Sequence, residues 1–528
     1  MLNRVPKTLW PLLSGLLMGL SWYYHLSLLL LVAWVPLLAF ESAFREGLIS
    51  KSRYRISIYF GFLVWNLIVS WWVVNASFGG AVVAFVLNSL FMTIVFVVYT
   101  HLRQVLAFPG NHWFLVPLWL AWEYGHTIWD LTWTWLTLGN VFSNLHPVVQ
   151  WYEFTGTSGG SAWVLISNIL VYRAFSRSRP IKAKLTVLGV IALPALISLV
   201  MYVVPKSQSE KQIQVVAVQP NIDPYNEKFL TGFSEQFEKT AAMVTPHIDS
   251  TTDLLIFPET FISENLNEEV INQSEEIDWF RGTYLHSFPK LSIVAGSNSY
   301  QLFNNVEDKP STARLDERMQ VWFDVYNTGL CISADTVHLY HKSKLVPGVE
   351  RMPFPALLKP LEALALDMGG TMGSLGTQAN RTVFTDERGH KSAPVICYES
   401  VYPDFVREYI VKGAQLITII TNDGWWGNTP GYRQHKDYAR LRAIECHREV
   451  VRSANTGTSC FIRVNGDSEQ ETAWWQPAVI SSKVNLYDDS TFFVKHGDLL
   501  SYTACLLAIA LLVWRVLIFV FRLVTKNP

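Results

Sequence analysis

The feature that most constrains this chain is a series of apolar runs between residues 8 and 204, with one more near the C-terminus. A membrane-spanning helix needs about 20 mostly apolar residues. Eight runs approach or exceed that length: residues 8–23, 26–40, 56–74, 80–100, 113–129, 159–172, 185–204 and 499–521. Only 16% of the residues are charged, whereas soluble domains carry about 25%. The sequence therefore predicts a membrane protein with eight transmembrane helices.

The first two runs are almost continuous. A single helix over residues 8–40 would be about 50 Å long, whereas the hydrocarbon core of a bilayer is about 30 Å thick. We therefore predict a tight helical hairpin. We also expect residues 1–24 to be retained rather than cleaved as a signal peptide, because further apolar runs follow and a small-residue cleavage site does not.

The distribution of Lys and Arg predicts the orientation in the membrane. These residues precede the first run and follow the second, fourth, sixth and last; they include Arg4, Lys7, Arg45, Lys51, Arg103, Arg173, Arg522 and Lys526. The intervening loops 75–79 and 130–158 contain neither Lys nor Arg. Positively charged loops stay in the cytoplasm, so we expect both termini there and the polar region after the seventh run on the outer side.

This pattern divides the chain into three parts. We predict a seven-span transmembrane region over residues 1–212 and an external domain over residues 213–490. Residues 491–528 would form the last transmembrane helix and a cytoplasmic tail.

The external region has the pattern of an α/β domain. Strand-like runs occupy residues 213–222, 253–263, 292–300, 325–347 (two strands in hairpin order), 392–400, 414–427 and 459–464. Helical patterns cover 403–414 and 432–451, and the first has a buried stripe made of Phe405, Val406, Tyr409 and Ile410. Strands that alternate with helices indicate an α/β fold, in which ligands bind where strands end.

Three of these strands end in residues that together form a nucleophile set: Glu259, Lys342 and Cys397. A thiol is mostly protonated at neutral pH and needs a base to become a nucleophile. A carboxylate can accept that proton and later return it, and an ammonium can stabilise the oxyanion formed on attack at a carbonyl. We therefore predict that Cys397 attacks a carbonyl, with Glu259 as base and Lys342 as oxyanion stabiliser. Lys344 is the alternative to Lys342.

Several other classes of function are disfavoured. The net charge of −1 gives no sign of a nucleic-acid partner. The five cysteines are odd in number and include no C-x-x-C, which argues against a disulfide framework and against a zinc site. Four of them we interpret as packing residues: Cys331, Cys446, Cys460 and Cys505. The chain also lacks a P-loop signature.

Local sequences around these residues resemble a known family. "FPE", "YHKSKLVPGVE" and "ICYES" are similar to the Glu-Lys-Cys pattern of the nitrilase, or carbon–nitrogen hydrolase, superfamily. With "LWLAWEYGHTIWDLTWTWLTLGN" in the membrane part and "TNDGWWG" and "HKDYARLRAIE" in the external part, the whole chain resembles the apolipoprotein N-acyltransferases. The resemblance implies an αββα sandwich joined to an eight-helix bundle.

The resemblance also implies roles for individual residues. The triad would be Glu259, Lys342 and Cys397, with no cofactor and no metal. Supporting or substrate-binding residues would be Glu350, Tyr398, Glu399, Trp425 and Trp426.

Two positions depart from the family pattern. Gly348 and Val349 stand where the family has Phe and Gly before Glu350, which affects the expected path of that loop. The Trp that the family carries after the first strand of the domain is absent, and Tyr225 or Phe229 is the candidate to replace it.

The implied reaction takes place at a bacterial inner membrane, with the catalytic domain in the periplasm. Cys397 would take an acyl chain from a phospholipid resembling phosphatidylethanolamine and hold it as a thioester. The α-amine of the S-diacylglyceryl-cysteine at the N-terminus of an apolipoprotein would then accept the chain, in a ping-pong sequence. A membrane-bound amidase or hydrolase of the same superfamily is the alternative.

Two features of the sequence keep two interpretations each. Glu123 lies inside a predicted span, where it is either functional or hydrogen-bonded within the helices. The aromatic loop 130–158 would either support lipid tails or form an interfacial Trp belt. We expect the glycine-rich segment 367–376 to be a mobile loop that gates lipid entry.

Overall fold

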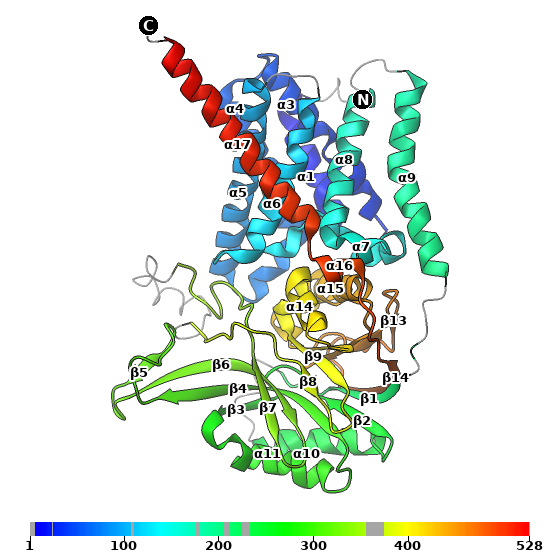
Figure 1. Ribbon diagram of the computed structural model, residues 1–528, viewed down its shortest axis with the longest axis vertical. Helices are drawn as coiled ribbons and strands as arrows, with labels where there is room; N and C mark the ends of the chain where they lie inside the picture. The colour runs from blue at the N-terminus through cyan, green and yellow to red at the C-terminus, as the bar shows by residue number, and fades with distance from the viewer. Residues whose placement is uncertain are drawn as a thin grey trace. The chain divides into compact units, whose positions relative to one another are not determined.

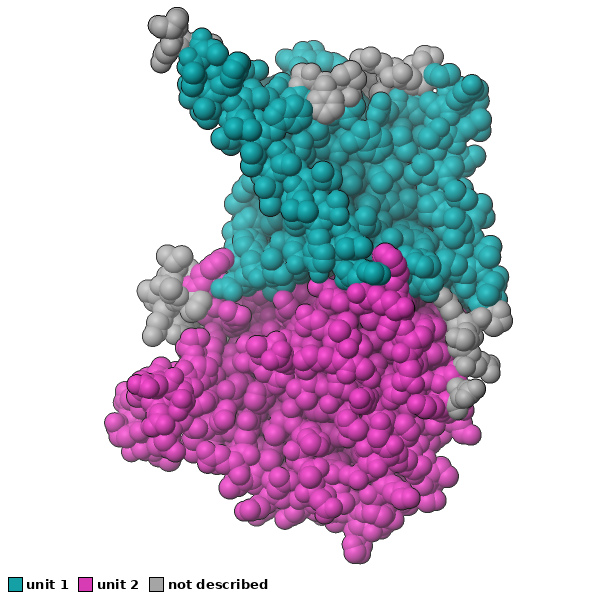
Figure 2. All heavy atoms as spheres, viewed as in Figure 1, with its two compact units in different colours: residues 1–74, 78–204, 496–528 teal, residues 75–77, 205–495 magenta. Residues whose placement is uncertain are grey.

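The protein is described by a computed structural model over residues 6–23, 25–106, 110–175, 180–204, 209, 211–223, 233–354 and 374–526. The chain forms two compact units (Figure 2). The first comprises residues 1–74, 78–204 and 496–528, and the second comprises residues 75–77 and 205–495.

The first unit is helical (Figure 1). Its described α-helices are α1 (Trp10–Leu20), α2 (Leu30–Ala33), α3 (Val35–Arg45), α4 (Lys51–Ser70), α5 (Phe78–Val105), α6 (Leu115–Ile128), α7 (Tyr152–Thr155), α8 (Thr157–Phe175), α9 (Ile181–Val203) and α17 (Leu499–Lys526). Five described helical segments are long and apolar enough to cross a membrane: Ser27–Arg45, Lys51–Asn75, Phe78–Val105, Ile181–Val203 and Leu499–Thr525. The other three predicted spans coincide with α1, α6 and α8, so the count of eight spans stays a prediction.

The helical break expected early in the chain lies between α1 and the segment that begins at Ser27. Pro36 stands in the first turn of α3, where backbone N–H groups have no partner within the helix. The hydroxyl of Ser14 in α1 accepts one of these, the N–H of Leu37, at 2.9 Å. This bond joins the two helices directly.

The aromatic loop between α6 and α8 is folded into short 3-10 turns, η6 (Thr134–Leu136) and η7 (Leu138–Val148). Trp135 is fully buried, which is incompatible with a place in an interfacial belt. Glu123 accepts hydrogen bonds on Oε1 from the indole of Trp119 at 3.1 Å and from the backbone N–H of Leu138 at 2.8 Å. Glu123 is therefore hydrogen-bonded within the helical unit, and its contacts hold η7 against α6.

Helix α9 is attached to its neighbours by hydrogen bonds to backbone groups. Pro194 inside α9 has no backbone N–H. The carbonyl oxygen of Val190, one turn earlier in the helix, therefore has no backbone donor. The indole N–H of Trp163 in α8 donates to that oxygen at 2.8 Å. The hydroxyl of Ser198, one turn beyond the proline, donates to the carbonyl of Pro147 in η7 at 2.8 Å.

The second unit contains two β-sheets. The eight-stranded sheet has the order β14-β1-β2-β4-β6-β5, with β3 paired to β4 and β7 paired to β6. The six-stranded sheet has the order β13-β12-β11-β10-β9-β8. The bounds are β1 Gln212–Gln219, β2 Thr252–Ile256, β3 Ile262–Asn267, β4 Ser292–Phe303, β5 Arg314–Asp316, β6 Val321–Ile332, β7 Val337–His341, β8 Phe384–Thr385, β9 Lys391–Ile396, β10 Leu416–Thr421, β11 Val450–Ala454, β12 Cys460–Ile462, β13 Ser468–Glu469 and β14 Ala478–Asn485.

Helices cover the outer faces of these sheets. Phe237 of α10 (Phe233–Val244) and Phe280 of α11 (Glu275–Phe280) belong to one buried cluster with side chains of β1, β2, β4 and β6. Helices α14 (Pro403–Val411) and α15 (Pro430–Cys446) lie beside the six-stranded sheet (Figure 1). The inner faces of the sheets meet where side chains of Ile396 and Ile420 approach the position of Gly329. The unit is therefore a four-layer sandwich.

The sequence predicted one helix of this unit correctly and misjudged the end of another. All four residues of the predicted stripe on α14 are buried, and the Gly413 beyond it has a φ of +92°, as a helix-ending glycine often does. The predicted helix 432–451 ends earlier, because α15 stops at Cys446 and His447 adopts a φ of +50°. The β-branched pair Val450 and Val451 belongs to β11 instead.

Candidate active site

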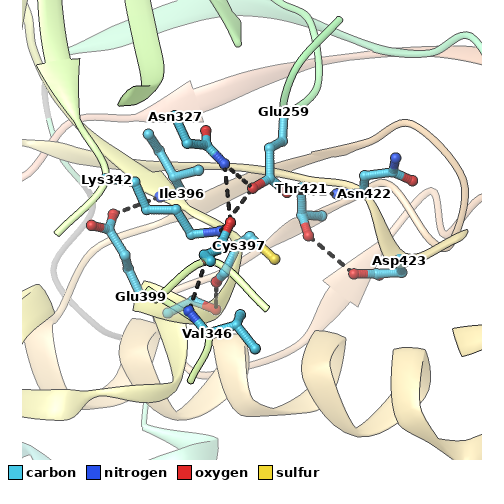
Figure 3. A network of polar contacts seen from close by, with 12 residues as sticks. Glu259, Asn327, Lys342, Val346, Ile396, Cys397, Glu399, Thr421, Asn422 and Asp423 are labelled. Carbon is cyan, nitrogen blue, oxygen red and sulfur yellow. Dashed lines mark hydrogen bonds and ion pairs between the residues drawn. The ribbon is translucent and has the colours of Figure 1, made fainter. Parts of the chain in front are cut away.

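The three predicted catalytic residues come together in the second unit. Glu259 follows β2, Lys342 follows β7 and Cys397 follows β9. Figure 3 shows their side chains converging. Strands β9, β10 and β11 are parallel, as are β1, β2 and β4. The carboxyl ends of parallel strands share one edge of a sheet, which is where ligands bind in α/β folds.

Glu259 is placed by a close approach between its loop and β4. The N–H of Gly296 in β4 donates to the carbonyl of Pro258 at 3.1 Å. A Cβ atom at position 296 would lie 2.6 Å from the Cα of Glu259 and 2.5 Å from the backbone nitrogen of Thr260. Only glycine leaves room for this loop, so Gly296 sets the position of the carboxylate.

Lys342 lies between two carboxylates and is almost completely buried. Its Nζ donates to Glu259 Oε1 at 2.9 Å and to Glu350 Oε1 at 2.8 Å. Lys344 is elsewhere: its Nζ lies 5.0 Å from the ring centroid of Tyr402. The structure thus brings Lys342, and not Lys344, to the predicted base.

The loop that departed from the family pattern returns Glu350 to Lys342 through a tight turn. Gly348 adopts a φ of +79°, and its N–H donates to the carbonyl of Arg351 at 2.8 Å. Glu350 Oε2 accepts the N–H of Val346 at 2.8 Å, so the carboxylate bonds both its own loop and the lysine.

Cys397 is the first residue beyond β9 and begins the short 3-10 helix η12 (Cys397–Val401). Its φ of +49° lies in the left-handed region, which is unfavourable for a side chain with a Cβ and concentrates at functional sites. The Glu259 carboxylate and the Thr421 hydroxyl lie close enough to the thiol to act on its pKa, the first raising it and the second lowering it. The strand therefore delivers the sulfur to the base in a strained turn.

The charges of the cluster favour an ionised base and a neutral thiol. Burial raises the pKa of the Glu259 carboxyl, but the adjacent Lys342 ammonium and the hydrogen bonds it receives hold that pKa below its usual value. Burial acts to lower the pKa of Lys342, and the carboxylates of Glu259 and Glu350 raise it well above its usual value. Burial and the charge of Glu259 raise the pKa of the Cys397 thiol. In these surroundings the Cys397 sulfur therefore keeps its proton at neutral pH.

Glu399 does not touch the triad but ties together the two segments that carry Lys342 and Cys397. Its Oε1 accepts the hydroxyl of Tyr340 at 2.6 Å and the N–H of Ser343 at 2.7 Å. Its Oε2 accepts the N–H of Ile396 at 2.8 Å. Glu399 therefore fixes the Lys342 and Cys397 segments relative to each other.

The burial of Glu399 leads to a prediction about stability and pH. Burial raises its pKa from 4.5 to about 7, so the folded chain keeps a proton that the unfolded chain releases. The stability from this group is fully present below pH 4.5 and is lost as the pH rises through about 7. Glu399→Gln cannot titrate. The unfolding free energy of the wild type minus that of Glu399→Gln should therefore fall by about 3 kcal/mol between pH 4.5 and about pH 7. Melting temperatures of both proteins across that range test it, and parallel curves would contradict it.

The remaining predicted residues have different surroundings. Tyr398 is buried with its ring 5.3 Å from that of Tyr402. Trp425 is 37% exposed, whereas the ring of Trp426 lies 5.3 Å from that of His435. Both tryptophans belong to the short helix η13 (Asp423–Trp426). Tyr225 and Phe229, and all of the glycine-rich segment 367–376 before residue 374, lie outside the described residues.

Two asparagines that sequence reasoning missed complete the surroundings of Glu259. Asn327 in β6 donates from Nδ2 to Glu259 Oε1 at 2.8 Å. The backbone N–H of Asn422 donates to Glu259 Oε2 at 3.1 Å. The motif "TND" after β10 was a signal for Asn422, whereas Asn327 lies inside a strand and has no local signal. Within the described ranges no group of three His, Cys, Asp or Glu residues could hold a metal ion.

Two family models and several curated proteins match the chain. The family model described as carbon-nitrogen hydrolase matches residues 214–488, and the model described as apolipoprotein N-acyltransferase N-terminal domain matches residues 14–170. The apolipoprotein N-acyltransferase of Chlorobaculum tepidum is 31% identical over 508 residues, 93% of each chain. The chain belongs to the apolipoprotein N-acyltransferase family. The apolipoprotein N-acyltransferase of Geobacter metallireducens is 25% identical over 536 residues, which cover 95% of this chain and 94% of that protein.

Membership of the apolipoprotein N-acyltransferase family accounts for both units. The protein is a membrane protein with a nitrilase-like α/β domain. All three converging residues fall inside the region matched by the carbon-nitrogen hydrolase model. A solved amidase of the nitrilase superfamily from Nesterenkonia AN1 aligns with 57% of this chain and 99% of its own, at 15% identity and a TM-score of 0.36.

Proposed function

We propose that this apolipoprotein N-acyltransferase moves an acyl chain from a membrane phospholipid to the α-amine of the S-diacylglyceryl-cysteine at the N-terminus of an apolipoprotein. The activity follows from the family to which the chain belongs. The observation that supports the mechanism is the contact of one carboxylate, Glu259, with both the Lys342 ammonium and the Cys397 thiol.

In the first step the sulfur of Cys397 attacks the ester carbonyl of a phospholipid resembling phosphatidylethanolamine, at its sn-1 chain. Glu259 takes the thiol proton as the carbon–sulfur bond forms. The Lys342 ammonium stabilises the negative oxygen of the tetrahedral intermediate. When the ester bond breaks, Glu259 returns the proton to the departing oxygen. A lysophospholipid leaves, and the acyl chain stays on sulfur as a thioester.

In the second step the neutral α-amine of the acceptor attacks the thioester. Glu259 removes a proton from the attacking nitrogen and supplies one to the departing sulfur, which restores the resting thiol. A thioester is close in energy to an oxygen ester, and an amide lies well below both. The second step therefore drives the pair of reactions without nucleotide energy.

Supporting residues act through the positions of these three groups. Glu350 accepts a second hydrogen bond from the Lys342 ammonium, and Glu399 ties the lysine and cysteine segments together. Tyr398, Trp425 and Trp426 are proposed to contact substrate. We place the protein in a bacterial inner membrane with eight spans, both termini in the cytoplasm and the catalytic domain in the periplasm.

Trapping the intermediate tests this order of events. The full-length protein is incubated in phosphatidylethanolamine vesicles without an acceptor, and the peptide containing Cys397 is examined by mass spectrometry. We expect an acyl adduct on that residue, and none in Cys397→Ala. Active protein that never carries the adduct would contradict the ping-pong order.

Addition of a diacylated lipopeptide to the trapped protein separates transferase from hydrolase. Transfer should yield an N-acylated peptide and release the adduct. Release of free fatty acid in place of the peptide product would favour the alternative hypothesis of an amidase or hydrolase. The residues needed for that chemistry are the same, and only the acceptor of the acyl chain differs.

Gly296→Ala should slow thioester formation without changing any group that takes part in it. The new Cβ meets the backbone of the Glu259 loop, which must shift. A displacement of about 1 Å in a catalytic group costs about 10²-fold in rate. Gly329→Ala is the matched control, because Gly329 pairs with Gly296 across β4 and β6 but its Cβ would meet nothing closer than 3.6 Å. Equal rates for both variants would contradict the placement argument.

A further inference from the structure

A network of buried polar and ionisable groups lies beside Cys397 and has no part in the proposed chemistry. Asp423, His435 and Arg452 are all completely buried. Arg452 in β11 donates from Nη2 to Asp423 Oδ2 at 2.5 Å. Asp423 Oδ1 lies 3.0 Å from Nδ1 of His435, which belongs to α15. Charged groups are stable away from solvent only where they are paired and hydrogen-bonded. Here Asp423 contacts both Arg452 and His435.

The network reaches Cys397 at two points. Nε2 of His435 lies 3.1 Å from the carbonyl oxygen of Cys397. A carbonyl oxygen only accepts, so Nε2 carries the hydrogen of this bond. On the other side, Thr421 donates to Asp423 Oδ1 at 3.0 Å, and its hydroxyl lies near enough to the Cys397 thiol to act on the thiol pKa. The backbone of Cys397 is therefore bonded to one partner of the buried aspartate, and its side chain lies near another.

The cysteine backbone needs such support. A φ of +49° is strained for a residue with a Cβ, at a cost of about 1–3 kcal/mol, and persists only where the surroundings impose it. The hydroxyl of Ser400 also donates to the Cys397 carbonyl, at 2.8 Å, and lies 2.9 Å from His435 Nε2. Two donors thus fix the carbonyl that follows the strained bond.

We propose that His435, oriented by Asp423 and Arg452, is a positioning residue that holds Cys397 in its left-handed conformation by a hydrogen bond to the cysteine carbonyl. The inference rests on the proposed role of Cys397 as nucleophile. His435 touches no reacting atom, so its removal should slow attack by the sulfur and leave phospholipid binding unchanged.

The test uses the full-length protein and three variants at position 435. Single-turnover thioester formation from phosphatidylethanolamine gives a maximal rate and a half-saturating lipid concentration. His435→Ala should lower the maximal rate by about 10²-fold, the size expected for a misplaced nucleophile, with the half-saturating concentration almost unchanged. His435→Gln should recover most of the rate, because a glutamine amide can donate near the position of Nε2. His435→Asn, whose amide is nearer to Nδ1, should not recover it.

A matched control separates positioning from general loss of packing. His390 also bonds an aspartate, Asp386, at 2.8 Å, but it lies next to the opposite end of β9 from Cys397. His390→Gln should leave the rate of thioester formation unchanged. If His435→Ala does not fold, Ser400→Ala removes the second donor to the Cys397 carbonyl and should lower the maximal rate several-fold while leaving lipid affinity unchanged.

Alkylation of Cys397 by iodoacetamide, followed by peptide mass spectrometry, gives a readout that needs no lipid. We expect slower alkylation in His435→Ala and recovery in His435→Gln. An unchanged thioester rate and an unchanged alkylation rate in His435→Ala would overturn the inference, as would equal losses in the Gln and Asn variants. If even the wild-type protein forms no thioester, the proposed function fails, and the alkylation series still decides the role of His435.

Discussion

Cys397→Ala should lower lipoprotein N-acylation by about 10⁴-fold or more, the largest loss of any single substitution in the chain. The sulfur is both the attacking atom and the carrier of the acyl chain, and no other group in the described site offers a nucleophile beside Glu259. The measurement is formation of N-acylated lipopeptide by the full-length protein in phosphatidylethanolamine vesicles, together with the yield of acyl adduct.

Cys331→Ala provides the comparison for that loss. Cys331 is also a buried cysteine near the end of a strand, but it lies in β6 and pairs with His338 of β7. The same substitution there should leave both adduct and product within a few-fold of wild type, apart from any loss of stability from the lost packing. Substantial N-acylation by Cys397→Ala would show that the acyl chain travels by direct transfer between lipids.

Lys342→Ala should reduce thioester formation by about 10³-fold. Loss of one oxyanion donor alone costs about 10²–10³-fold. The substitution also leaves Glu259 and Glu350 as neighbouring buried carboxylates without their cation, which disfavours the ionised base. Removing one partner of a buried ion pair is destabilising by about 3–5 kcal/mol, so the melting temperature is measured beside the rate.

Lys344→Ala is the control for this prediction, because the two lysines are two residues apart in one loop. The Lys344 Nζ lies over the rings of Tyr402 and Phe405, 5.0 Å and 6.0 Å from their centroids. Its loss should change the rate of adduct formation by only a few-fold. If Lys344→Ala blocks the adduct and Lys342→Ala does not, the assignment of the oxyanion stabiliser is wrong.

The convergence of Glu259, Lys342 and Cys397 could be predicted from the sequence because each stands where an apolar strand ends. Strand patterns around residues 253–263 and 392–400 were plain, and Glu259 and Cys397 each come directly after an apolar run. The hairpin predicted over 325–347 is also present as β6 and β7. Local pattern was sufficient, because the α/β architecture brings strand ends together without any further information.

The partners of the triad were not predictable in the same way. Asn327 reaches Glu259 only because β6 lies next to β4 in the sheet. The local sequence around a residue inside a strand does not indicate which residues its side chain will contact. The segment around Trp135 was expected to be an external loop, because it lacks the length of a helical span. Its burial depends on contacts with α6 and α8, which are set by tertiary packing rather than by local sequence.

The attachment of α9 has a consequence for how that helix can fail. Lipid tails are as apolar as leucine, so burial of side chains gives little force to keep one membrane helix against another. Within an apolar stretch of 18 residues in α9, only 11% of the residues are buried. The helix therefore depends on a few directional bonds, and the carbonyl freed by Pro194 is the acceptor of one of them. Pro194 therefore stabilises the packing of α9 against α8, because it leaves the Val190 carbonyl free to accept the Trp163 indole N–H. A residue with a backbone N–H at position 194 would compete for that carbonyl and weaken the contact between the two helices.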